Sequence, residues 1–264
     1  MKIFKKIVKA SFNKLGFDIV KISDNNYPFN GNQNQDFPPD FFPKEIDIIK
    51  EVIPYTMTSK ERLYSLIKAV NYVSKNNIEG DIVECGVWKG GSMMAIAKAL
   101  KNLNDETRDL YLFDTFSGMT EPSDKDKDFK GEKASYLLNN ARKDDSYSVW
   151  CLASIEIVKE AMQKTGYEKQ KIHFIQGMVE ETIPKNAPTS ISLLRLDTDW
   201  YESTKHELIH LYPRLSVGGI IIIDDYGYWQ GSRLATDEYI EQNNVKILLH
   251  RIDNTGRIAV KLEE

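Results

Sequence analysis

Short apolar runs and stretches with helical spacing alternate along most of this chain. The runs are rich in Val, Ile and Leu, as in buried strands. They predict strands at 81–85, 110–116, 171–176, 191–196 and 219–224. Apolar residues at helical spacing predict helices at 44–52, 59–76, 92–100, 149–165, 202–211 and 232–242. Because strands and helices alternate from residue 80 onward, we predict an α/β fold with a doubly wound parallel sheet.

The C-terminal pattern predicts a different kind of strand pairing. Two apolar segments, 245–251 and 257–262, flank the turn sequence Asp253-Asn254-Thr255-Gly256. Such turn residues between two strands are typical of a β-hairpin. The hairpin would add an antiparallel strand to the parallel sheet. That arrangement is more typical of methyltransferases than of nicotinamide-binding domains.

The N-terminal region differs in character from the rest of the chain. Residues 2–21 combine an apolar face with a lysine-rich face, and 24–43 are polar and rich in proline and aromatic residues. The helix at 2–21 either anchors to a membrane surface or packs on the protein or a neighbouring subunit. We favour packing, since one short helix binds membranes weakly. We therefore divide the chain into an extension, 1–53, that covers an oligomer interface or part of a substrate site, and a main domain, 54–264.

A long charged segment interrupts the α/β pattern at 117–147, and it contains the sequence DKDKD at 124–128. It is too long for an ordinary strand-to-helix connection. We expect a mobile or lid-like insertion that shapes a substrate site.

Composition narrows the class of protein. The 264 residues include 35 Lys and Arg against 39 Asp and Glu, for a net charge of −4, so a nucleic-acid-binding surface is not expected. Two cysteines without paired spacing indicate a reducing compartment. We found neither an apolar run of about 18 residues nor a signal peptide. We therefore expect a cytoplasmic protein, with a membrane as an unlikely partner.

The first candidate site is the glycine turn between the strand at 81–85 and the following helix. It carries Glu84, Gly86, Trp88, Gly91 and Ser92. Glycine allows a ligand to approach the backbone, and a helix N-terminus offers free N–H groups. A carboxylate beside the turn would repel a pyrophosphate, whereas it suits the sulfonium and ammonium groups of S-adenosylmethionine. The alternative is a tight turn with a solvated Glu84.

The second candidate is Asp114, at the end of the strand 110–116 and 28 residues after Gly86. Ligands of open α/β sheets lie at the carboxyl ends of the strands. An acidic residue there can accept hydrogen bonds from both ribose hydroxyls of a nucleoside. The alternative is a helix-capping Asp.

The third candidate is a group of four carboxylates. Asp197 and Asp199 follow the strand 191–196, and Asp224 and Asp225 follow the next strand. Carboxylates at neighbouring strand ends repel one another unless a cation joins them. Ligands that are all oxygen favour Mg²⁺ over Zn²⁺. Capping residues that face solvent are the alternative.

These motifs, in their order, resemble those of the macrocin-type O-methyltransferases, which methylate deoxysugar hydroxyls of macrolide and aminocoumarin antibiotics. The resemblance covers about residues 54–262. It rests on the segments TMTSKERLYSLIKAV, GDIVECGVWKGGSMMAIAKAL, LYLFDTFSGM and LLRLDTDWYESTKHELIHLYPRLSVGGIIIIDDYGYWQG. It implies a class I methyltransferase fold, S-adenosylmethionine, Mg²⁺ and a homodimer or homotetramer.

The resemblance also implies roles for individual residues. It makes Asp197, Asp224 and Asp225 the metal ligands. It makes Asp199 the general base, so that Asp199 and Asp197 form the catalytic pair. It implies that Thr56, Met57 and Ser59 belong to a segment that lies over the cofactor. It also implies that Gln176, Gly177 and Met178 lie near the adenine.

The acceptor implied by the resemblance is a sugar hydroxyl of a glycosylated metabolite or a polysaccharide precursor. Two other functions stay open at this point. One is a catechol-type O-methyltransferase that acts on a phenol. The other is a non-catalytic nucleotide-binding protein with the same fold.

Overall fold

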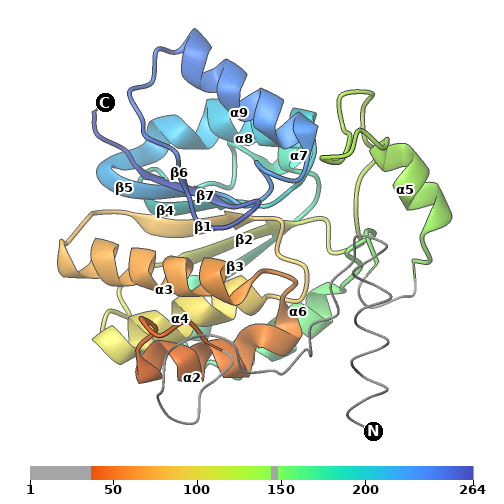
Figure 1. Cartoon of the computed structure of the whole chain (residues 1–264). Coiled ribbons are helices and arrows are strands. Elements are labelled where there is room, and N and C mark those ends of the chain that lie inside the picture. Colours follow the sequence, from red (N-terminus) through yellow and green to blue (C-terminus); the bar gives the residue numbers. More distant parts are fainter. Residues whose placement is uncertain (1–36, 144–147, 264) are drawn as a thin grey trace, which may run out of the picture. The chain divides into compact units, whose positions relative to one another are not determined.

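The computed structural model describes residues 37–143 and 148–263 of the chain (Figure 1). The chain divides into two compact units, Met1–Asp40 and Phe41–Glu264. The helix predicted at 2–21 and most of the predicted loop at 24–43 lie outside the described residues, so both stay predictions.

A single seven-stranded sheet organises the larger unit, in the strand order β3-β2-β1-β4-β5-β7-β6 (Figure 1). The strands are β1 (Asp81–Cys85), β2 (Leu110–Asp114), β3 (Ile172–Gln176), β4 (Ile191–Leu196), β5 (Leu215–Ile223), β6 (His250–Arg251) and β7 (Arg257–Val260). Strands β1 to β5 pair in parallel, whereas β7 pairs antiparallel to β5 and to β6. Both the parallel sheet and the antiparallel hairpin are therefore confirmed.

Helices cover the two faces of this sheet, which makes the sandwich of a doubly wound fold (Figure 1). One face carries α2 (Pro43–Val52), α3 (Lys60–Lys75), α4 (Gly91–Leu103) and α6 (Ile155–Gln163). The other carries α7 (Val179–Thr182), α8 (Tyr201–Leu211) and α9 (Gln230–Gln242). The short helices α5 (Ala134–Asn140) and α7 were not predicted, and α6 begins six residues later than the predicted start at 149.

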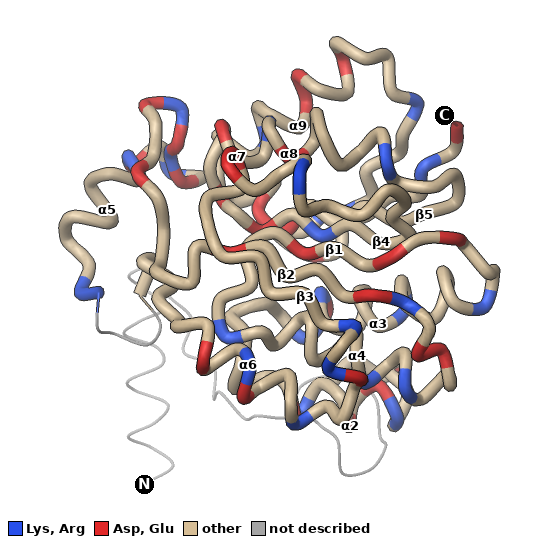
Figure 2. Tube along the Cα trace, turned by 180° about the vertical axis from the view of Figure 1, so that it is seen from behind, with Lys and Arg blue, Asp and Glu red and all other residues tan. Residues whose placement is uncertain are grey.

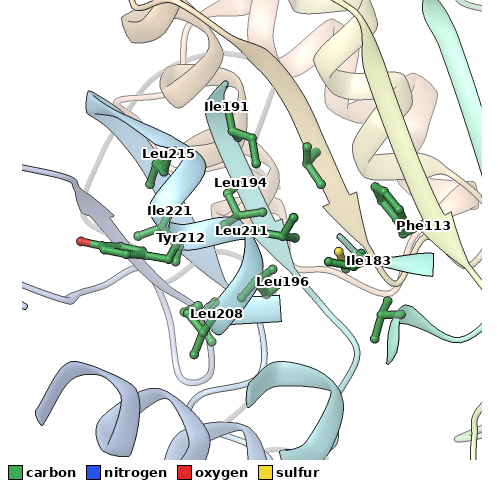
Figure 3. Packing of buried hydrophobic residues seen from close by; sticks show 14 of the residues in the cluster. Phe113, Ile183, Ile191, Leu194, Leu196, Leu208, Leu211, Tyr212, Leu215 and Ile221 are labelled. Atoms are coloured by element: carbon green, nitrogen blue, oxygen red, sulfur yellow. The ribbon is translucent and has the colours of Figure 1, made fainter. Parts of the chain in front are cut away.

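The core lies where β4 passes through the middle of the sheet. All six residues of β4 are buried, as expected for a parallel strand that is covered on both faces. Its Leu194 and Leu196 pack in one cluster with Leu208 and Leu211 of α8 (Figure 3). Burying each such side chain contributes about 1.5–3 kcal/mol, so this cluster fixes α8 and the loop before it.

Helix α2 belongs to the larger unit, which begins at Phe41 rather than at residue 54. Its residues Ile46, Ile49 and Val52 are buried, and the helix contacts α3 and α4. The apolar face of α2 is therefore part of the main core, and only the chain before Phe41 forms a separate unit.

The charged insertion is attached to the body of the protein at several points. The carboxylate of Asp126, 1% exposed, accepts hydrogen bonds from the backbone N–H of Tyr201 and of Ser123, each at 2.7 Å. A bridge pairs Asp128 with Trp229. Basic and acidic residues alternate along this loop (Figure 2). The described part of the insertion is therefore docked on the body of the protein, and its expected mobile or lid-like behaviour stays a prediction.

No helix in the described part of the chain is long and apolar enough to cross a membrane.

Candidate functional site

A cavity of about 480 Å³ opens at the carboxyl ends of β1, β2, β4 and β5. Three sides of its wall come from residues far apart in the sequence. The first side is the turn after β1, the second is the insertion after β2, and the third is the pair of acidic strand ends. The described lining residues include Thr56, Met57, Gly86, Trp88, Ser92, Asp114, Met119, Cys151, Gly177, Met178, Asp197, Asp199, Asp224, Asp225, Tyr228 and Trp229.

The glycine turn after β1 is shaped by close backbone approach. Gly86 has φ +81°, and a Cβ atom there would clash with the carbonyl of Asp197. Trp88 also adopts a left-handed conformation, with φ 47°. Non-glycine residues in this region are strained and cluster at ligand sites. The turn therefore brings the β1 and β4 ends together at the floor of the cavity.

Asp114 ties this turn to β2. One carboxylate oxygen accepts the backbone N–H groups of Val87 at 2.6 Å and Trp88 at 3.1 Å. The other accepts the N–H of Phe116 at 2.7 Å. Burial raises the pKa of Asp114, while these hydrogen bonds oppose the shift. Asp114 lines the cavity as expected for a ribose ligand, but much of its acceptor capacity already serves the turn.

Glu84 lies beneath the cavity, where it pairs with Arg195. Its side chain is fully buried, and one oxygen lies 2.5 Å from Nη1 of Arg195. Burial raises the pKa of Glu84 to about 7, against the opposing effect of Arg195. Among the described residues Glu84 does not line the cavity. In this structure Glu84 contacts an arginine, and its expected contact with the cationic end of the cofactor stays a prediction.

Arg195 joins three strands through its carboxylate partners. It lies opposite Glu84 in the β1–β4 pairing, and it contacts Asp197 at 2.7 Å and Asp224 at 2.6 Å. The residue was not predicted from the sequence. The available signal was a lone arginine inside an apolar strand, which a buried position allows only when the charge is paired.

Three carboxylates gather above this arginine. Ligand atoms of Asp197, Asp199 and Asp225 all lie within 4.8 Å of one another, the spacing of a possible metal site. Burial, followed by carboxylate neighbours, raises the pKa of Asp225, and burial raises the pKa of Asp197 against the opposing charge of Arg195. Oδ2 of Asp225 is buried and accepts no hydrogen bond from the described residues. A bound cation or a shared proton would each relieve the repulsion within such a cluster.

Asp224 differs from the expected ligand role. Its Oδ1 accepts from Arg195, and its Oδ2 faces Nη1 of Arg62 and the hydroxyl of Thr58, the latter at 3.2 Å. Although burial acts in the opposite direction, the two arginines hold the pKa of Asp224 below its usual value. Asp199 thus completes the carboxylate cluster in the place expected for Asp224.

Asp199 occupies an unusual backbone position just beyond β4. Its φ is +68°, which turns the side chain toward Asp225 and the cavity. Burial raises its pKa to about 7, against a hydrogen bond with Asp225. A carboxylate with such a pKa is suited to accept a proton near neutral pH.

The remaining predicted residues divide into two groups. Thr56, Met57, Ser92, Gly177 and Met178 line the cavity. Three others are not among the described lining residues: Ser59, Gly91 and Gln176.

Local structure explains the positions of these three. The Ser59 hydroxyl accepts the N–H of Arg62 as N-cap of α3 and donates to Asp253 at 2.5 Å. Gly91 packs against the backbone of Tyr55, and Gln176 is exposed. In this structure Ser59 and Gly91 support the covering segment and the turn, and their expected contact with the cofactor stays a prediction.

An aromatic wall lies beside the carboxylates, since the side chain of Trp229 donates a hydrogen bond to Asp199. Tyr228 and Trp229 line it, and the ring of Trp229 contacts that of Trp200 edge to face, with centroids 4.9 Å apart. Trp200 in turn donates from Nε1 to the carbonyl of Thr120 in the insertion. This wall was not predicted, since its parts come from the insertion, the loop after β4 and the loop after β5.

Several known proteins are similar to this chain in sequence and in fold. The profile of the family Macrocin-O-methyltransferase (TylF) matches residues 43–260. The 8-demethyl-8-(2,3-dimethoxy-alpha-L-rhamnosyl)-tetracenomycin-C 4'-O-methyltransferase of Streptomyces olivaceus is 31% identical over 222 residues, 84% of this chain and 81% of that enzyme. The demethyldecarbamoylnovobiocin O-methyltransferase of Streptomyces niveus is 31% identical over 202 residues, 76% of this chain and 74% of its own. The solved structure of the O-methyltransferase NovP superposes with a TM-score of 0.69 and 27% identity, covering 79% of this chain and 83% of NovP.

Proposed function

The chain belongs to the macrocin O-methyltransferase family and is therefore an O-methyltransferase, and from this premise we propose its reaction. It transfers a methyl group from S-adenosylmethionine to a sugar hydroxyl of a glycosylated metabolite or polysaccharide precursor, with the help of Mg²⁺. The observation that carries this proposal is the carboxylate cluster of Asp197, Asp199 and Asp225 beside a cavity large enough for a nucleoside cofactor.

The residues around the glycine turn fit the cofactor. Gly86 and Trp88 lie on one side of the cavity, and Thr56 and Met57 lie in the segment before α3. We propose that these residues enclose the methionine part, with Asp114 directed to the ribose. Met178 and its neighbour Gly177 would border the adenine.

The donor set at the acidic strand ends fits a hard divalent ion. All donors are carboxylate oxygens, and one oxygen of Asp225 is buried without a partner among the described residues. Asp197 and Asp225 are common to the set expected from the sequence and the set grouped in the structure, so we assign the ion to these two. The third carboxylate is Asp224 in the first set and Asp199 in the second, and the variants described below distinguish them.

Methyl transfer needs an acceptor oxygen in line with the methyl group and a base for its proton. When bound, S-adenosylmethionine supplies the electrophilic methyl group, and Mg²⁺ orients the acceptor hydroxyl and lowers its pKa. We assign Asp199 to take the proton from that hydroxyl, because its raised pKa and its position suit a base. We assign Asp197, which is close to Asp199, as a metal ligand. The new C–O bond forms as the C–S bond breaks, and the sulfur keeps the electron pair.

The acceptor assignment rests on the relatives and on the aromatic wall. The Streptomyces olivaceus relative is named for a rhamnosyl substrate. Tyr228 and Trp229 line the cavity beside the carboxylates, and the flat apolar faces of such rings pack well against the C–H groups of a sugar ring. We also propose a homo-oligomer, which light scattering of the full chain would test.

The decisive experiment follows methyl transfer from labelled S-adenosylmethionine into a panel of glycosylated acceptors, with Mg²⁺ and with chelator. We expect labelled product from a glycoside, lost in chelator. Full activity in chelator would refute the metal assignment. Calorimetry with S-adenosylhomocysteine provides a control that is independent of the acceptor, because the cofactor should bind even when the acceptor is wrong.

A further inference from the structure

Asp224 has a positively charged partner on each side. Nη2 of Arg195 lies 2.6 Å from its Oδ1, and Nη1 of Arg62 contacts its Oδ2. The side chains of Arg62 and Asp224 are 14% and 4% exposed, so water weakens this contact little. The adjacent Asp225 points instead into the carboxylate cluster. One arginine therefore holds Asp224 apart from the ion site that its neighbour helps to form.

We propose that Arg62 is an internal competitor of the metal ion: it occupies Asp224 while no ion is bound, and it must release this carboxylate before the ion can use it. The inference rests on the proposed function, since it assumes a divalent ion at the carboxylate cluster. It also explains why the cluster in the structure contains Asp199 where the sequence implied Asp224.

The release of Arg62 is a local exchange rather than the exposure of a buried charge. Nε of Arg62 already lies 2.9 Å from Oδ2 of Asp253. Asp253 is itself fixed, because its other oxygen accepts the N–H of Gly256 at 2.8 Å and its Oδ2 accepts the hydroxyl of Ser59. Arg62 thus keeps one partner when it leaves Asp224. Asp224 in turn keeps Arg195.

Arg195 does not offer the same exchange. It is fully enclosed, with 3% of its side chain exposed, and it has carboxylate partners on β1 and β4 as well as Asp224. Moving it would leave the buried Glu84 unpaired, which is costly. Arg62 is therefore the partner of Asp224 that is free to yield.

The test is a titration of the full chain with Mn²⁺, followed by electron paramagnetic resonance of the free ion. Arg62→Gln should tighten Mn²⁺ binding by about tenfold to a hundredfold, the value of one charge-assisted hydrogen bond. Asp253→Asn should weaken it, because Arg62 then has Asp224 as its remaining carboxylate partner among the described contacts. Lys98→Gln removes a lysine paired with Glu51 at the surface and should change nothing.

A double-mutant cycle separates competition from simple charge repulsion, since an arginine near the site would weaken metal binding even without competing for a ligand. In an Asp224→Asn background, competition predicts that Arg62→Gln has no further effect on Mn²⁺ affinity. An equal gain in both backgrounds would overturn the proposal. Arg62→Lys, which keeps the charge, should give an intermediate affinity for Mn²⁺. This variant replaces Arg62→Gln in the test if the Gln variant folds poorly.

The outcomes also separate this inference from the function on which it rests. If neither the unchanged protein nor any variant binds Mn²⁺, the proposed metal site fails and this inference fails with it. If the unchanged protein and Arg62→Gln bind Mn²⁺ equally, the inference fails while the metal site stands. Melting curves by circular dichroism establish that each variant is folded.

Discussion

Asp126 offers a sharp test of how the charged insertion is held against the active-site cavity. Its carboxylate is buried and accepts the backbone N–H of Tyr201, the first residue of α8. The other oxygen accepts both the N–H and the hydroxyl of Ser123, each at 2.7 Å. Because α8 directly follows the loop that carries Asp199, we expect Asp126→Ala to weaken both the fold and the acceptor site.

The magnitude follows from the bonds that are lost. A hydrogen bond to a charged group contributes about 1.5–3 kcal/mol, and loss of a helix cap costs about 0.5–2 kcal/mol. Loss of the three charge-assisted bonds, each partly replaced by water, gives a decrease of roughly 3 kcal/mol in the free energy of unfolding. Asp124, two residues away, is the matched control: its side chain is 91% exposed and pairs with Lys133 at the surface. Asp124→Ala should leave the unfolding midpoint unchanged.

Two measurements decide this prediction. Urea unfolding of both variants gives the stability difference. Separate measurements of acceptor binding and S-adenosylhomocysteine binding isolate the local effect, because Trp229 of the aromatic wall packs on Trp200, which is hydrogen-bonded to the insertion. We expect Asp126→Ala to raise the KM for the acceptor several-fold and to leave cofactor affinity within about twofold. Equal unfolding midpoints for the Asp126 and Asp124 variants would refute the reasoning.

Three further predictions concern the site and its supports. Asp199→Asn should cut turnover by about 10²–10⁴ with nearly normal Mn²⁺ affinity if Asp199 is the base, whereas a comparable loss of Mn²⁺ affinity in a titration would make it the third ligand. Gly86→Ala should abolish S-adenosylhomocysteine binding by calorimetry, since its Cβ would meet the Asp197 carbonyl; retained affinity would contradict the close approach. Burial opposes the shift, but hydrogen bonds and Arg62 lower the pKa of Asp253 to about 2. A carboxylate with a lowered pKa stabilises the fold at pH values above the pKa of the unfolded state, which is near 4. The unchanged protein should therefore exceed Asp253→Asn in the free energy of unfolding by about 1–2 kcal/mol, after allowance for partial exposure. Acid unfolding curves should show this difference shrinking as the pH falls from about 5 to 2.

Local chemistry explains how much of the fold the sequence determined by itself. Strand β1 begins and ends where the apolar run predicted, and Ser59, the first residue of the helix predicted at 59–76, is the N-cap of α3. The hairpin follows from the turn residues Asp253 to Gly256. Alternation of apolar runs with helical spacing, together with turn and cap residues, acts over a few positions. For that reason these elements could be predicted from the sequence without knowledge of distant parts of the chain.

The acidic site could also be predicted in part from the sequence. Parallel strands end at one edge of a sheet, so the aspartates that follow β4 and β5 had to meet. Their grouping near the cavity follows from topology alone. The identity of the third member of the cluster, Asp199 instead of Asp224, does not.

Only the tertiary structure decided which charge partners each carboxylate has. Arg195 and Glu84 are 111 residues apart, and Arg62 and Asp224 are 162 residues apart. A buried charge must find a partner, but the sequence does not say which of several carboxylates is close enough. The docking of the insertion through Asp126 has the same origin. These contacts depend on distances between elements that packing of the whole core sets, and a few ångströms there determine which acid is paired with an arginine and which is left for an ion.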